Sequence, residues 1–213
     1  EQYELDNYRE LLDLDDKYSG YQKVAANVIA MDGTNWFSSF TIDKGSKEGI
    51  KKGMNVIAGS GLVGIVTDVG PNFAKVRSII DDSSNVSSMV LTTKDNFNVG
   101  GSLKSMNQDK VLPFTELRDE DDKVKVGDPV VTSYVSDQYQ EGILIGYIAS
   151  IEKNANNLTK SGTITPVVDF QHLREVLVIT TLKDTGEKEL SSQKASDTQT
   201  ETQDNTETQK SQE

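Results

Sequence analysis

The sequence contains no cysteine and only one histidine, which removes many of the residue types on which catalysis and metal binding depend. Without cysteine the chain forms no disulfide, no thiolate metal site and no cysteine nucleophile. The single histidine, His172, has no second histidine or cysteine with which to build the usual zinc site. We therefore expect no enzyme activity, no metal site and no cofactor, and a surface or capping role for His172.

Motifs for phosphate binding and hydrolysis are also missing. The sequence has neither G-x-x-x-x-G-K-[ST] nor G-x-G-x-x-G, and Gly59-Ser60-Gly61 lacks the surrounding nucleophile pattern. No apolar run approaches the roughly 18 residues that cross a bilayer. The chain does not begin with methionine and opens inside a helical pattern. We interpret it as a fragment whose upstream part is missing.

The charge balance argues against nucleic acid as a partner. Lys and Arg number 22 and Asp and Glu number 34, which gives a formal net charge of -12. Phosphate backbones repel such a surface, because nucleic-acid affinity comes mainly from cations. Two acidic clusters, Asp81-Asp82 and Asp119–Asp122, lack the spacing of a dedicated calcium loop. We expect both clusters to be solvated loops.

Residues 1–18 carry a helical pattern in which apolar side chains recur at steps of three and four. Leu5, Tyr8 and Leu12 fit heptad positions a and d. One interpretation is the end of a longer coiled coil that pairs two chains through Leu5, Tyr8, Leu11 and Leu12. The alternative is a helix packed on its own domain. Ser19-Gly20 predicts the end of the helix.

From Val24 to about Leu182 short β-branched runs alternate with clusters of Gly, Asn, Asp and Ser. This spacing favours a mainly β fold, either a sandwich or barrels. The aromatic content of 7% suits small barrels filled by Val, Ile and Leu. The expected strands include 24–30, 36–42, 62–69, 75–80, 86–92, 142–151 and 175–181.

An internal echo indicates two related barrels. Lys51–Ile57 (KKGMNVI) resembles Lys125–Val131 (KVGDPVV), and each is followed by a glycine-bounded apolar strand. Duplication is the favoured interpretation. The alternative is that turns of the KxG type recur by chance in all-β chains. After these strands, residues 183–213 predict a disordered tail rich in Ser, Thr, Gln and Glu, because from Ser191 onward the only apolar side chain is Ala195.

Eight strings of the sequence carry a resemblance to a known family. They are Asp32–Trp36, Ile42–Gly45, Gly49–Val56, Gly61–Val66, Gly127–Ser133, Gly142–Gly146, Pro166–Phe170 and Leu173–Val178. In this order they resemble the bacterial cell-shape protein family MreC from about Val24 to Ile179. Each string alone is a weak signal, but the series with a helical stem before it is a strong one. The tail resembles that of streptococcal or related Gram-positive members.

The resemblance implies a coiled-coil stem and two small six-stranded β-barrels on the extracytoplasmic side, tethered by a single transmembrane helix upstream of this fragment. It implies a non-catalytic scaffold of the peptidoglycan elongation machinery that controls cell shape. The partners it implies are MreD, penicillin-binding proteins, RodA, RodZ and a second copy of the chain, in a homodimer or a higher assembly. It implies no catalytic residue.

These observations predict four parts: a stem over 1–20, a first barrel over 21–95, a second barrel over 96–182 and the tail over 183–213. The sequence leaves open whether the last strand, about 166–182, returns to the first barrel. Tyr134–Glu141 departs from the usual family loop, and we expect Tyr134 and Tyr139 to supply protein contacts there. Two rival functions are a wall-polymer or glycan-binding module and a protease-like double barrel.

Overall fold

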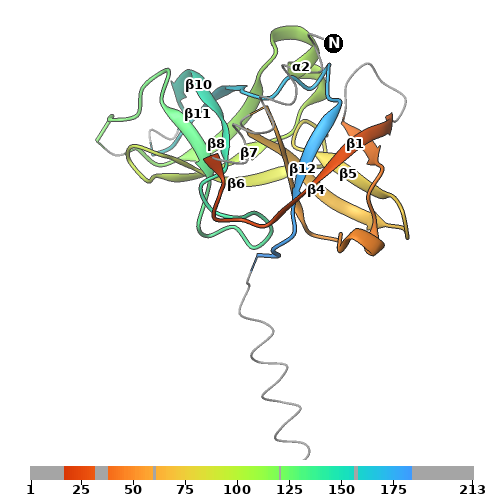
Figure 1. The fold of residues 1–213 in the computed structure, drawn as a ribbon. Helices are drawn as coiled ribbons and strands as arrows, with labels where there is room; N and C mark the ends of the chain where they lie inside the picture. Colours follow the sequence, from red (N-terminus) through yellow and green to blue (C-terminus); the bar gives the residue numbers. More distant parts are fainter. Residues whose placement is uncertain (1–16, 32–37, 60, 120, 156–157, 184–213) are drawn as a thin grey trace, which may run out of the picture. The chain divides into compact units, whose positions relative to one another are not determined.

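The computed structural model describes residues 17–31, 38–59, 61–119, 121–155 and 158–183. Within this part the chain forms two closed six-stranded antiparallel barrels, which confirms the mainly β, double-barrel prediction (Figure 1). The predicted stem residues Leu5, Tyr8, Leu11 and Leu12, and the predicted tail after Lys183, lie outside the described residues.

The first barrel has the strand order β1-β12-β3-β4-β5-β2. Its last strand in the sequence, β12, pairs with β1 on one side and with β3 on the other. In Figure 1 this blue strand lies beside the orange-red β1. The strands are β1 (Lys23–Met31), β2 (Ser39–Ile42), β3 (Asn55–Ala58), β4 (Gly61–Val69), β5 (Ala74–Ser78) and β12 (Glu175–Ile179).

The second barrel has the order β10-β11-β8-β7-β6-β9. The predicted boundary near residue 95 is wrong, because β6 already belongs to this barrel. A short helix, α2 (Leu103–Asp109), connects β7 to β8, and a 3-10 turn, η1 (Ser46–Glu48), lies in the first barrel. The strands are β6 (Asn85–Val90), β7 (Asn96–Gly100), β8 (Leu112–Leu117), β9 (Pro129–Thr132), β10 (Leu144–Lys153) and β11 (Lys160–Pro166).

The two barrels repeat one topology. Starting from β4 the first barrel runs β4-β5-β2-β1-β12-β3, and starting from β10 the second runs β10-β11-β8-β7-β6-β9. The echoed turns make the same backbone bond: Gly53 N–H donates to Val66 O at 2.9 Å, and Gly127 N–H donates to Ile148 O at 2.8 Å. Both glycines have positive φ, which explains why glycine recurs there. This equivalence supports duplication, with β12 in the place that β6 takes in the second barrel.

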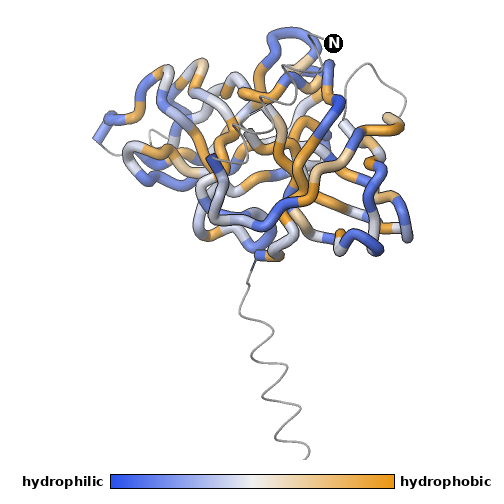
Figure 2. The backbone as a smooth tube through the Cα atoms, in the orientation of Figure 1, coloured by the Kyte–Doolittle hydropathy of each residue, from blue (hydrophilic) through white to orange (hydrophobic). Residues whose placement is uncertain are grey.

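Alternating side chains fill the barrel interiors. Phe40 and Ile42 of β2 are buried in the first barrel, and Phe114 and Leu112 of β8 in the second. Figure 2 shows hydrophobic residues concentrated along the strands and hydrophilic ones along many of the turns. This pattern follows from a strand geometry that sends successive side chains to opposite faces.

A polar seam joins the barrels through the loop that precedes β10. Asn55 of β3 donates from Nδ2 to Gln138 O at 2.9 Å and accepts at Oδ1 from Gln140 N–H at 2.7 Å. Gln140 Nε2 in turn donates to Thr181 O at 2.9 Å. Asn55 is buried, so its amide replaces water for two backbone groups of the other barrel.

The described segment before β1 also contacts the second barrel. Tyr18 is buried, and its hydroxyl accepts from Leu144 N–H at 3.1 Å. Tyr21 donates from its hydroxyl to Glu141 O at 3.3 Å. Since β1 begins only two residues later, the chain entering the first barrel is fixed against the second.

A buried ion pair fixes the loop after β8. Lys160 Nζ lies 2.6 Å from Asp119 Oδ2 and 2.5 Å from Asp122 Oδ1. Asp119 also accepts from the N–H groups of Lys123 at 2.8 Å and Val124 at 3.1 Å. The expectation that residues 119–122 are solvated is wrong for Asp119, which is buried, because these three donors compensate its desolvation.

The pairing sets the pKa values of both carboxyl groups. Burial alone would raise the pKa of Asp119, but hydrogen bonds from Lys160 and two backbone N–H groups bring it below the ordinary value. Hydrogen bonds from Lys160 and Lys153 lower the pKa of the more exposed Asp122 to about 2. A carboxyl group whose pKa is lowered by folding stabilises the folded state at pH values above its pKa in the unfolded chain, which is near 4.

The seam predicts that Asn55→Ala is destabilising. The substitution leaves buried donor and acceptor groups of the 138–140 segment without a partner, which costs about 1–3 kcal/mol of unfolding free energy. Urea unfolding followed by circular dichroism measures the difference. Asn85→Ala on the exposed start of β6 is the matched control, with a change within about 0.5 kcal/mol. Equal effects of the two substitutions would contradict the seam.

The ion pair predicts a specific acid dependence. We expect the unfolding free energy to fall between about pH 4 and pH 2, as Asp119 and Asp122 are protonated through their depressed folded pKa values. Asp119→Asn should unfold about 2 kcal/mol more easily at pH 7 and lose less stability on acidification. Urea melts across this pH range measure both effects. The exposed control Asp137→Asn should follow the parent curve; an Asp119→Asn curve parallel to the parent would refute the assignment.

Candidate functional site

In the second barrel the ladder between β7 and β8 is short. On its other side β7 pairs with β6 at five positions, from Asn85↔Gly100 to Met89↔Asn96. The ladder to β8 has only two pairs, Asn98↔Thr115 and Val99↔Phe114. The ladder therefore does not include the start of β7 or the end of β8.

β8 contains a β-bulge where it pairs with β11. Gly162 of β11 faces Phe114, but Lys160 faces Leu117, so three steps along β8 match two along β11. The bulge includes Glu116, whose φ of +64° is uncommon for a residue other than glycine. A bulge bends and twists its strand, which agrees with the end of the β7–β8 ladder beside it.

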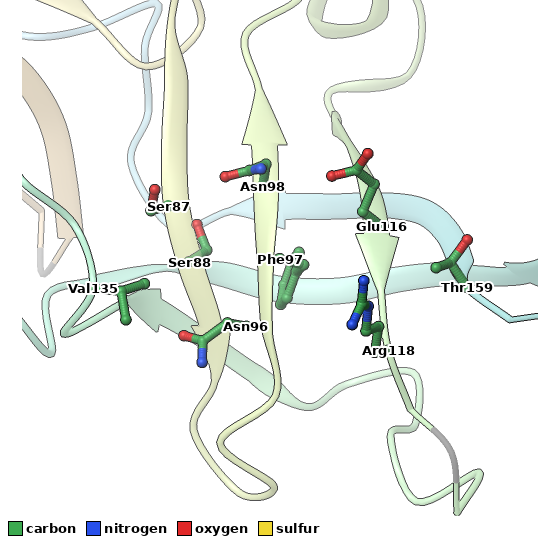
Figure 3. Close-up of a pocket in the computed structure, with 9 residues that line it drawn as sticks. All are labelled: Ser87, Ser88, Asn96, Phe97, Asn98, Glu116, Arg118, Val135 and Thr159. Carbon is green, nitrogen blue, oxygen red and sulfur yellow. The ribbon is translucent and has the colours of Figure 1, made fainter.

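A pocket of about 520 Å³, which we call the β7–β8 groove, lies beside the bulge and is lined by residues of β6, β7 and β8 and of neighbouring loops. In Figure 3 the Phe97 ring lies between the two strands, with Asn98 and Glu116 toward one end and Asn96 and Arg118 toward the other. The volume is in the range of ligand sites. The lining residues are Ser87, Ser88, Asn96, Phe97, Asn98, Glu116, Arg118, Val135 and Thr159.

The groove offers hydrogen bonds above an apolar floor. Phe97 is buried and packs on Phe114 with ring centroids 5.0 Å apart, which fixes the floor. Glu116 and Arg118 are exposed and carry opposite charges at the β8 side. A second pocket of about 520 Å³, lined by Asp95 and Lys123 among others, shares Arg118 with the groove. This lining suits a polar or charged partner, and His172 is not part of it.

Backbone strain gathers around the groove. Four described residues other than glycine have positive φ, and Lys94, Glu116 and Asp122 are three of them. Lys94 lies in the turn before β7, Glu116 in the bulge and Asp122 in the loop after β8. Such conformations persist where the surrounding structure enforces them, and they cluster at binding sites.

The two tyrosines predicted to contact partners have different surroundings. Tyr139 is only 3% exposed, and burial raises its pKa to about 12. Its side chain therefore belongs to the core rather than to a contact surface, because the 133–141 loop folds into the seam. Tyr134 is 53% exposed and precedes Val135, which lines the groove. The structure thus leaves Tyr134 as the accessible member of the pair.

His172 lies in an exposed turn before β12. Its Nδ1 is 2.7 Å from Asp169 Oδ2, and both side chains are well exposed. This i,i+3 pair fits a role in holding the turn. In the part of the chain that the structure describes, no cluster of three His, Cys, Asp or Glu side chains is arranged to hold a metal. No described helix is long and apolar enough to cross a membrane.

The groove was not anticipated from the sequence. The alternation Asn96-Phe97-Asn98 is a strand signal, but nothing in it shows that the ladder to β8 stops. Thr115-Glu116 carries no glycine to announce a bulge with positive φ. A register mismatch between β8 and β11 is visible only once the barrel is closed.

Comparisons with known proteins fit this fold. A cell-shape protein from Listeria monocytogenes, described as "Cell shape-determining protein MreC", is 34% identical over 173 residues, which is 80% of this chain and 58% of that protein. The chain therefore spans less than two thirds of this relative. A solved MreC structure from Listeria superposes with a TM-score of 0.67 at 32% identity and covers 85% of this chain and 90% of that one.

A more distant structure shares the fold alone. It is described as a complex between penicillin-binding protein 2 and MreC from Helicobacter pylori, with a TM-score of 0.56 at 12% identity, covering 75% of this chain and 100% of that one. Residues 28–180 also match the family described as "Rod shape-determining protein MreC, barrel core". The match includes strands of both barrels and the whole groove, and the chain belongs to the MreC family.

Proposed function

We propose that this chain is the extracytoplasmic part of a non-catalytic scaffold for peptidoglycan elongation, and that its β7–β8 groove binds a penicillin-binding protein. The observation that carries the proposal is an open, mixed-charge groove in a barrel core of the cell-shape family. The complex of penicillin-binding protein 2 with MreC from Helicobacter pylori supports this class of partner. Tyr134, exposed beside the groove, extends the contact surface.

The proposal includes the anchoring and assembly that the resemblance implies. An upstream transmembrane helix tethers the scaffold, the stem pairs two copies, and MreD, RodA and RodZ are further members of the complex. The pairing face of the stem is Leu5, Tyr8, Leu11 and Leu12, of which Leu5, Tyr8 and Leu12 have the a and d spacing of a heptad and Leu11 is adjacent to them.

The rival glycan-binding function is less well supported. A sugar-binding site of this kind needs an exposed aromatic ring. Phe97 is the one aromatic residue that lines the groove, and it is only 5% exposed. Of the other aromatic residues that such a module could use, Trp36 lies outside the described residues and Tyr139 is buried, whereas Tyr134 and Tyr147 are exposed but do not line the groove. The polar lining is better matched to a protein segment.

Charge reversal in the groove tests the proposed function. Arg118→Glu should weaken binding of the penicillin-binding protein's extracytoplasmic domain about tenfold, because it places two like charges at the β8 side of the groove. Isothermal titration calorimetry measures the affinity. Arg174→Glu, in an exposed position before β12, should change the affinity by less than twofold. Equal affinities of the two variants would exclude the groove as the binding site.

Replacement of the stem leucines tests the pairing. Leu5→Asp combined with Leu12→Asp should convert a dimer of the chain into a monomer, because each change places a charge in the heptad seam. Analytical ultracentrifugation gives the mass of the species in solution. Glu4→Ala combined with Glu10→Ala, outside the a and d positions, should leave the dimer intact. A parent chain that is monomeric at all concentrations would contradict stem pairing.

A further inference from the structure

One face of the first barrel is covered by a loop of the second. Asn55 of β3 pairs with Ile65 of β4 and with Ile179 of β12, and we call these three residues the Asn55 row. Residues opposite one another in a ladder share a face of the sheet, and all three are buried. The cover is the 138–140 segment, whose two outer residues bond to Asn55 and whose central residue, Tyr139, is buried. A polypeptide loop therefore closes this face.

The second barrel carries the equivalent row in exposed form. Pro129 takes the place of Asn55 in the echoed turn. Pro129 pairs with Tyr147 of β10, and its carbonyl accepts from Leu91 N–H at 2.9 Å. Tyr147 is 44% exposed and Leu91 is 42% exposed, whereas their counterparts in the Asn55 row are buried. We call Leu91, Pro129 and Tyr147 the apolar row.

The apolar row continues a surface that is already buried between the barrels. The next row on the same outer face is Met89, Val131 and Leu144, which form a hydrophobic cluster against Val167. Gly61 of β4 comes so close to Leu144 O and to Val167 that a β-carbon there would collide with both. The neighbouring row is therefore an interface, and the apolar row is the part of this face that the first barrel leaves exposed.

The lengths of two equivalent hairpins explain the difference between the rows. The connection from β9 to β10 covers residues 133–143 and reaches the first barrel. Its counterpart from β3 to β4 covers only residues 59–60. Two residues make a tight hairpin turn and no more. The first barrel's hairpin is therefore too short to do for the apolar row what the 138–140 segment does for the Asn55 row.

The apolar row also adjoins the proposed binding groove. Leu91 is followed directly by Thr92 and Thr93, which line the second pocket. That pocket shares Arg118 with the β7–β8 groove. An apolar cluster beside a polar and charged rim is the composition of a protein interface, in which tyrosine side chains often carry much of the binding energy.

We propose that the apolar row is the hydrophobic part of the binding surface for the penicillin-binding protein, and that a loop of this partner covers it with an apolar or aromatic side chain. The inference rests on the proposed function and extends the contact from the groove to the outer face of β9 and β10. The tip of the loop is uncharged. Pro129 has no side-chain hydrogen-bonding group to compensate a buried charge, whereas Asn55 has an amide.

The Asn55 row favours a polypeptide as the occupant, because a polypeptide loop covers the same position of the repeat there. A second copy of this chain also has loops, and its Tyr134 is exposed. Self-association is therefore an outcome that the experiment distinguishes from binding of the penicillin-binding protein.

Replacement of the exposed tyrosine tests the apolar row. In calorimetric titration of the full 213-residue chain with the penicillin-binding protein's extracytoplasmic domain, Tyr147→Ser should bind about tenfold more weakly than the parent. Phe73→Ser is the matched control and should change the affinity by less than twofold, because Phe73 is an aromatic residue of similar exposure, 41%, in the first barrel. Equal affinities of these two variants would overturn the inference, and a weakened Arg118→Glu in the same series would leave the proposed function standing.

Two further outcomes are decisive. Absence of binding by the parent chain would overturn the proposed function and the inference with it. If Tyr147→Ser weakens self-association in the ultracentrifuge but not the binding of the penicillin-binding protein, the occupant is a second copy and the proposal is wrong.

Tyrosine labelling provides a readout that does not depend on the folding of a variant. Nitration of the parent chain by tetranitromethane, followed by mass spectrometry, reports how accessible each tyrosine is. In the complex with the penicillin-binding protein, Tyr147 and Tyr134 should both be nitrated several-fold more slowly than in the free chain, since both are exposed there. Protection of Tyr134 alone would overturn the inference and leave the proposed function standing. Protection of neither would overturn both.

Discussion

Closure of the first barrel by β12 is the constraint on which the rest of the structure depends. A six-stranded barrel leaves no open edge only if each strand has two neighbours, and β12 is the strand that joins β1 to β3. Because β12 follows the whole second barrel in the sequence, the first barrel is built from two stretches of chain, and the strands of the second barrel, β6 to β11, lie between them. The seam of Asn55, Gln138 and Gln140 and the anchoring of Tyr18 at Leu144 then hold the two barrels together.

Within this closed framework the β7–β8 ladder has the fewest residue pairs. The β1–β2 ladder, which corresponds to β7–β8, has three pairs, and the β7–β8 ladder has two. The bulge at Glu116 lies where β8 pairs with β11, and the Lys160 and Asp119 pair fixes the loop that follows. The groove is thus lined on the β8 side by a strand whose end is fixed by a buried ion pair. A site held in this way is prepared for a partner before the partner arrives.

Much of the fold was predictable from the sequence, because β-branched runs and glycine turns are local signals. The echo of Lys51–Ile57 at Lys125–Val131 predicted the repeat, and Gly53 and Gly127 show its physical basis in the same positive-φ turn. Burial of particular loop residues was not predictable. Tyr139 and Asp119 lie in polar stretches. Tyr139 is buried because its loop packs against the opposite barrel, and Asp119 is buried beside its ion-pair partner Lys160. The predicted domain boundary near residue 95 was wrong for a similar reason, because the sequence of a strand does not show which strands it pairs with.

The central claim is that the β7–β8 groove is where the scaffold receives a cell-wall synthase. A photo-crosslinking amino acid placed at Asn98 in living cells measures this most directly, with Phe73, an exposed position in the first barrel, as the comparison. The account predicts that Asn98 crosslinks to a penicillin-binding protein and that Phe73 does not. A crosslink to that partner from Phe73 and none from Asn98 would contradict it.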